Sequence, residues 1–201
     1  MRAEAGGPRQ RWLEQLARTL VASFLVLNVV LIALRPDLSI RQDGISSYLA
    51  GDFRWLGVLT FLLLSAGGAL LAAAVRTSAE PSRRLLSALL FLYSLGVLLA
   101  GLTPPDSGLH YAGAFAAFTT IPVAALVSSS GRRLLWFVVL VASFATWPVL
   151  HFGAGERLTT VLEVAWLLSL RPLPASRDRA ARPDSTAPPD RDTRGPGAGQ
   201  A

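Results

Sequence analysis

The sequence contains no cysteine, which excludes disulfide bonds, thiolate metal sites and cysteine nucleophiles. It also lacks three familiar functional motifs: a phosphate-binding glycine loop, the His-Glu-x-x-His zinc motif and the Gly-x-Ser-x-Gly motif of serine hydrolases. Charged residues make up only 16% of the 201 residues, whereas 52% are hydrophobic. This composition is too apolar for an ordinary soluble domain of this size, and it indicates a membrane protein.

Long stretches without charged residues divide the chain into candidate transmembrane helices, each of which needs about 20 mostly apolar residues. We predict six of them, at residues 16–34, 55–75, 85–102, 109–128, 134–150 and 153–170. The first is interpreted as a retained helix rather than a signal peptide, because no small-x-small cleavage pattern precedes Arg35 and Pro36. The sixth is the least apolar, since Glu156, Arg157 and Glu163 interrupt it.

The predicted fold is therefore an all-α membrane protein with three parts. Residues 1–15 form a cytoplasmic N-terminal segment, residues 16–172 form a bundle of six transmembrane helices, and residues 173–201 form a cytoplasmic tail. The tail consists mainly of Pro, Arg, Asp, Gly and Ala. Such a composition buries too little apolar surface to offset the entropy lost on ordering, so we predict that the tail is disordered.

The arginines predict the orientation, because the cytoplasmic loops of membrane proteins carry an excess of basic residues. With both ends in the cytoplasm, fifteen arginines fall on the inner side and four on the outer side, at positions 35, 41, 54 and 157. Trp55 and Trp147 fall near the outer interface and the other three tryptophans near the inner one, as expected for rings at the headgroup level. We therefore expect a multi-pass protein of the cell membrane.

The net charge of +6 does not indicate nucleic-acid binding. Arginines that flank membrane helices account for the charge, and no basic patch is interleaved with aromatic residues. The expected partners are the lipid bilayer and a lipid or small amphiphile, with no nucleic acid, and the sequence requires no cofactor.

Polar residues that are candidates for a functional site gather on the predicted outer side of the bundle. They are Ser46, Tyr48, Asp106, His110, His151, Glu156 and Arg157. We predict that all of them except Arg157 face one shared cavity, and that Asp106, His110, His151 and Glu156 are the catalytic candidates. A zinc site of three histidines is excluded because the chain has only two. The ligand types of His110, His151 and either Asp106 or Glu156 would nevertheless suit zinc.

Asp106 and His110 are four residues apart, so that they would share one face of a helix. Under one interpretation, Asp106 caps the N terminus of that helix and offsets its positive end. Under the other, Asp106 orients His110 and fixes its tautomer for proton transfer or metal ligation. The sequence leaves both interpretations open.

Glu163 lies near the middle of the sixth predicted span, where a carboxylate facing lipid would be costly. We therefore predict that its side chain points into the bundle, on the stripe shared with Glu156 and Thr160. It either locks helix packing through hydrogen bonds, with Asn28 among the available partners, or serves as a site or relay residue.

Three segments of the chain, in this order, resemble a bacterial membrane family known as domain of unknown function 998. They are Gly44–Gly51 (Gly-Ile-Ser-Ser-Tyr-Leu-Ala-Gly), Gly101–Asp106 (Gly-Leu-Thr-Pro-Pro-Asp) followed by His110, and Gly155-Glu156-Arg157 followed by Trp166. The resemblance covers about residues 15 to 172. It implies six membrane spans and an outer polar cluster, and it implies no established activity.

Three functions are compatible with these features. A binding or transport-related bundle would explain the outer polar cluster and Glu163. A membrane-embedded hydrolase of a lipid or other amphiphile, metal-assisted in one version, would explain why Ser46, Asp106, His110 and His151 converge. A structural or regulatory membrane subunit would explain the absence of familiar motifs.

Overall fold

The computed structural model describes residues 8–76, 80–128 and 131–170, and every regular element in these ranges is a helix. The elements are α1 (Pro8–Leu34), the 3₁₀ helix η1 (Ile45–Leu49), α2 (Arg54–Val75), α3 (Pro81–Leu102), α4 (Gly108–Val127), α5 (Arg133–Ala145), α6 (Trp147–Leu150) and α7 (Phe152–Ser169). The predicted all-α class is confirmed for this part of the chain. The predicted tail at residues 173–201 lies outside the described residues.

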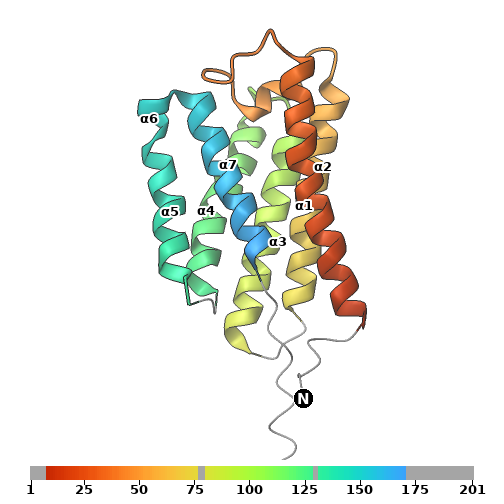
Figure 1. Cartoon of the computed structure of the whole chain (residues 1–201), viewed down its shortest axis with the longest axis vertical. Helices are drawn as coiled ribbons and strands as arrows, with labels where there is room; N and C mark the ends of the chain where they lie inside the picture. Colours follow the sequence, from red (N-terminus) through yellow and green to blue (C-terminus); the bar gives the residue numbers. More distant parts are fainter. Residues whose placement is uncertain (1–7, 77–79, 129–130, 171–201) are drawn as a thin grey trace, which may run out of the picture.

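The long helices stand side by side in one bundle (Figure 1). Helices that follow one another along the chain pack together from α1 to α5, and α7 closes the bundle by contacting α1, α5 and α6. Three connections meet at the same end of the bundle, which is uppermost in Figure 1: residues 35–53 with η1, residues 103–107, and α6. We call this end the η1 end.

Four helices, α1 to α4, are long and apolar enough to cross a bilayer. Helix α1 is described from Pro8, so it extends toward the N terminus beyond the predicted span, which starts at residue 16. Helix α5 is apolar but has only 13 residues. Helix α7 has 18 residues and carries two glutamates and an arginine, so neither α5 nor α7 meets the same standard of length and hydropathy.

The predicted span at residues 134–150 is divided into two helices, α5 and α6. The division follows from Pro148, which lacks the N–H that would bond to the carbonyl four residues earlier in a continuous helix. Helix α7 then begins after His151, which has a φ of 65° and is the one non-glycine residue with positive φ in the described ranges. The chain thus turns sharply between α6 and α7 at the η1 end.

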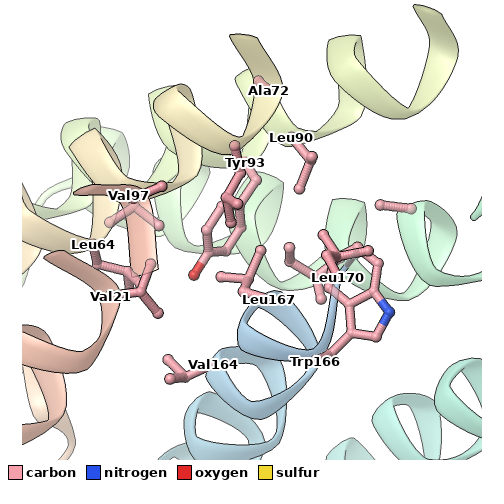
Figure 2. Packing of buried hydrophobic residues seen from close by; sticks show 14 of the residues in the cluster. Val21, Leu64, Ala72, Leu90, Tyr93, Val97, Val164, Trp166, Leu167 and Leu170 are labelled. Carbon is pink, nitrogen blue, oxygen red and sulfur yellow. The ribbon is translucent and has the colours of Figure 1, made fainter. Parts of the chain in front are cut away.

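The centre of the bundle combines large buried side chains with close contacts between helix backbones. Tyr93 and Trp166 are both almost completely buried, and Figure 2 shows Tyr93 reaching from α3 toward Val164 and Leu167 of α7. A Cβ atom on Gly96 would collide with backbone atoms of α4. The absence of a side chain there lets α3 and α4 approach closely, as small residues commonly do in membrane bundles.

The distribution of polarity is that of a membrane protein rather than a soluble one. Large apolar side chains cover the outside, among them Val29 (66% exposed) and Phe91 (53% exposed). Polar side chains lie inside and bond across helices, as where the Ser65 hydroxyl of α2 donates to the Ser94 carbonyl of α3 at 2.8 Å. Such interhelical hydrogen bonds satisfy polar groups that lipid could not.

Candidate functional site

The long loop between α1 and α2 is fastened to the start of α7. The Arg157 guanidinium donates to the Asp43 carbonyl at 3.1 Å and to the Tyr48 hydroxyl at 3.3 Å, and it lies over the Tyr48 ring at 5.3 Å. The Ala154 N–H also donates to the Arg41 carbonyl at 3.2 Å. Gly153 permits this contact, because a Cβ there would collide with the backbone of Asp43. Arg157 and Tyr48 therefore hold the loop in place.

Glu156 joins the same loop to the interior of the bundle. Its Oε2 atom accepts a hydrogen bond of 3.0 Å from the backbone N–H of Ile45, although its side chain is almost completely buried. Gly44 makes room for the carboxylate, since a Cβ on that residue would collide with Glu156 Oε2. The glycine that precedes η1 is thus required by the position of an acidic side chain on α7.

His110 is buried and held in one orientation by the backbone. Its Nδ1 atom lies 2.8 Å from the carbonyl oxygen of Ala100, so that in the neutral ring Nδ1 carries the proton and Nε2 the lone pair. The N-cap of α4 is Ser107, whose hydroxyl accepts from the His110 N–H at 3.1 Å. Both roles considered for Asp106 thus belong to other residues: Ser107 caps the helix, and Ala100 orients the imidazole.

A groove of about 890 Å³ runs along the side of the bundle between α4 and α5 and reaches the η1 end. Its walls are mainly aromatic and aliphatic, and the lining residue Phe118 packs edge to face on Phe144 at 5.8 Å and on Trp147 at 5.5 Å. Phe115, which is 71% exposed, lines its open side. Polar residues also line the groove: Ser46, Ser47, Asp106, His110, Tyr111, Thr119, Trp147 and Glu156.

A smaller cavity of about 40 Å³ adjoins the groove in the interior. The two share five lining residues: Ser46, His110, Ala114, Phe118 and Glu156. Beyond them the small cavity is bordered by Thr160 and Glu163 of α7 and by Tyr93 of α3. Because about 10–15 Å³ of such volume holds one water molecule, the cavity has room for a few waters or a small polar group.

Glu163 points into the bundle, as predicted, with only 2% of its surface exposed. Its Oε1 atom and the Tyr93 hydroxyl are both buried and have no hydrogen-bond partner among the described residues. Asn28, considered as a partner for Glu163, instead donates to the Phe24 carbonyl of its own helix at 2.9 Å. Among the described residues, Glu163 therefore has no hydrogen bond that would lock helix packing.

The structure brings together four of the six residues expected in one cavity: Ser46, Asp106, His110 and Glu156 all line the groove. Tyr48 is buried instead in an apolar cluster with Leu31 and Leu56. His151 is exposed at the turn before α7 and lines neither the groove nor the small cavity. Their expected placement in that cavity is therefore not found.

The metal candidates His110, His151 and Asp106 do not form a site in the part of the chain that the structure describes. In residues 8–76, 80–128 and 131–170, no three His, Asp or Glu side chains come close enough together to hold a metal ion. The hypothesis of a metal centre therefore receives no support from the geometry.

Two features of the site were not predicted from the sequence. The first is the aromatic lining of the groove, for which a signal exists on α4: Phe115 and Phe118 are three residues apart, a spacing that places two side chains on one face of a helix. The second is Tyr93, which resembles an ordinary core residue in the sequence. Only its unpartnered hydroxyl in a cavity with Glu163 distinguishes it.

The all-helical bundle, its apolar exterior and its four helices of spanning length define an integral, multi-pass membrane protein. A family model described as "Protein of unknown function (DUF998)" matches residues 20–171, so the chain belongs to this family. The resemblance noted in the sequence is thereby confirmed. No curated protein and no solved structure matches the chain.

Proposed function

We propose that this protein crosses the cell membrane six times and binds a lipid-like amphiphile in the groove between α4 and α5. In this proposal α1–α4 are the first four spans, α5 together with α6 forms the fifth, and α7 forms the sixth. In Figure 1 the fifth and sixth extend alongside α4 in the same bundle. Helix α7 supports a membrane position because Glu156 and Glu163 are buried, whereas Leu158 and Val161 are on its exposed side.

The proposed orientation has both termini in the cytoplasm and the η1 end outside. It rests on the excess of arginines on the opposite side of the bundle, which is the side that faces the cytoplasm in most membrane proteins. The groove then opens sideways into the bilayer and ends near the outer headgroup level.

Amphiphile binding is supported by the change from apolar lining residues in the groove to polar lining residues at the adjoining cavity. An apolar chain fits a groove lined by Phe118, Phe144 and Val141, and a polar head fits the end where His110 and Glu156 face the adjoining cavity. Ligand sites typically combine mostly apolar walls with a few polar groups that fix orientation. The proposed role is therefore binding, or a step in transport, of a molecule taken from the outer leaflet.

Photolabelling of the full-length protein in lipid nanodiscs tests this function. A long-chain alkyl diazirine probe should label residues of α4 and α5 that line the groove, and mass spectrometry of the peptides would locate the label. Ala114→Trp should block the labelling, because Ala114 lines both the groove and the small cavity. Ala112→Trp is the matched control: Ala112 lies on the exposed side of the same helix and lines neither space. Labelling spread evenly over outward residues such as Val29 of α1 would contradict the proposal.

Hydrolysis of the bound amphiphile is a second candidate, supported by one observation. The bond from Nδ1 of His110 to Ala100 leaves Nε2 as the basic nitrogen, and Ser46 lines the same two spaces as His110. A buried histidine with a fixed tautomer is suited to act as a general base. Release of fatty acid from a fluorogenic ester by wild-type protein, with none from His110→Ala, would support hydrolysis over binding alone.

A further inference from the structure

The polar end of the site contains acids but no permanent cation. Glu156 and Glu163 line the small cavity, and Asp106 lines the adjoining groove. None of the described residues that line the two spaces is an arginine, and the chain has no lysine. Arg157, which directly follows Glu156 in the chain, donates hydrogen bonds to the Asp43 carbonyl and the Tyr48 hydroxyl of the loop. The electrostatics therefore disfavour a phosphate or carboxylate head.

Two buried polar atoms in the cavity lack partners that a ligand would supply. The Oε1 atom of Glu163 and the hydroxyl of Tyr93 are each buried and have no hydrogen-bond partner within the described residues, and both side chains line the cavity. An unmade hydrogen bond at a buried group is costly, and an unpaired buried carboxylate is costlier still. A hydrogen-bond donor that carries positive charge would satisfy both atoms, with His110 and Thr160 lining the same space.

We propose that the amphiphile is a long-chain primary amine whose ammonium group enters the small cavity and pairs with Glu163, while its alkyl chain occupies the groove. This inference rests on the proposed function, because it names the head of the molecule that the groove binds. Glu156, already bonded to Ile45, lines the entrance as a second carboxyl group, and the Tyr93 hydroxyl accepts a second hydrogen bond from the ammonium group.

The size of the cavity selects among cationic heads. At about 40 Å³ it holds an ammonium group with one or two waters. A quaternary ammonium is several times larger than a water molecule and has no N–H to donate, so it would leave Glu163 and Tyr93 without hydrogen bonds. A primary amine provides three donors in a compact group, and it fits the two unpartnered atoms best.

Competition against the alkyl diazirine probe tests the proposed head group on the full chain in nanodiscs. The competitors are dodecylamine, dodecanol, dodecyl phosphate and ethylamine. Dodecylamine should displace the probe at a concentration about tenfold or more below that needed for dodecanol, because charge-assisted hydrogen bonds are stronger than neutral ones. Dodecyl phosphate should compete less well than dodecanol, and ethylamine should not compete, since it lacks the chain that fills the groove.

Variants test whether the preference for dodecylamine over dodecanol depends on the proposed residues. Glu163→Gln keeps the shape of the side chain and should bring the ratio of amine to alcohol affinity close to one. Tyr93→Phe should lower the ratio by a smaller factor, and it serves as a second test if Glu163→Gln does not fold. Asp52→Asn is the charge-matched control, because Asp52 is exposed in the loop and lines neither space, so that the ratio should stay at its wild-type value.

The outcomes separate this inference from the function on which it rests. If dodecanol or dodecyl phosphate competes as well as dodecylamine, the amine head is wrong although amphiphile binding stands. An unchanged ratio in Glu163→Gln would likewise overturn the inference, as would ethylamine competing as well as dodecylamine. If the probe does not label the groove at all, the proposed function itself fails.

Discussion

Glu156 and Gly44, which lie on α7 and in the first loop, occupy positions that depend on each other. The carboxylate of Glu156 fills the space where a Cβ of residue 44 would be, and from there it accepts the 3.0 Å hydrogen bond from Ile45. The loop that covers the η1 end is therefore held by a side chain that also lines the proposed binding site. Loop position and site geometry are coupled through this contact.

Gly44→Ala should displace the Glu156 side chain and break its bond to Ile45. The expected cost is about 1–3 kcal/mol, because a buried backbone N–H is left without a partner. The measurement is thermal unfolding of the purified protein. Gly108→Ala is the control, since a Cβ at Gly108 meets no atom within 4 Å and should leave stability nearly unchanged.

A double-mutant cycle makes the same prediction sharper. If Gly44→Ala acts through Glu156, combining it with Glu156→Ala should cost clearly less than the sum of the two single changes, because residues in contact are not additive. Strict additivity would show that the alanine at position 44 destabilises the loop by another route.

A local ion pair within the loop, between Arg35 and Asp37, predicts a dependence on pH. The Arg35 guanidinium bonds both carboxylate oxygens, at 2.9 and 2.8 Å, and this holds the pKa of Asp37 below its usual range. A carboxyl with a lowered folded-state pKa stabilises the fold above its unfolded pKa of about 3.9, and that contribution is lost as the pH falls through the folded value. Wild type should therefore exceed Asp37→Asn in melting temperature at pH 7, by a small margin because Asp37 is exposed. The difference should vanish well below about pH 4, and a difference that persists in acid would contradict the prediction.

Topology reporters test the six spans and their orientation. Fusions placed after Arg76 and after Arg171 should report the cytoplasm, and a fusion after Pro105 should report the outside. The basis is the unequal distribution of arginines on the two sides of the bundle. A cytoplasmic signal from the Pro105 fusion would refute this orientation. An external signal after Arg171, with the other two as expected, would instead show an odd number of spans.

The sequence predicts those parts of the fold that depend on local composition. Apolar stretches located the helices well, and the cost of a charge in lipid placed Glu163 inside the bundle. The partner of His110 could not be predicted, because it is the backbone carbonyl of Ala100, and any residue type supplies that acceptor. The contact between Ile45 and Glu156 spans 111 residues along the chain, and helical periodicity within one segment carries no information about it.

Glu163 and Glu156 should respond with opposite signs to the same substitution, although they are seven residues apart on one helix. Glu156 has a partner in Ile45, so Glu156→Leu removes a buried hydrogen bond and should cost about 1–3 kcal/mol. Glu163 has a buried oxygen with no partner among the described residues, so Glu163→Leu removes a polar group that no protein group satisfies. Apolar replacement of such a group is commonly neutral or stabilising, and we expect a gain of up to about 1 kcal/mol, or about 2–4 °C in melting temperature.

Thermal unfolding of both variants without added ligand measures this contrast, and wild-type protein with dodecylamine provides the reference for the occupied site. A ligand that binds only the folded state raises the melting temperature of wild type, whereas Glu163→Leu should gain little from the same addition. A residue retained for binding is expected to lower the stability of the empty protein in this way. If Glu163→Leu is instead as destabilised as Glu156→Leu, then Glu163 supports the fold, and its unpartnered oxygen has no role in recognising a ligand.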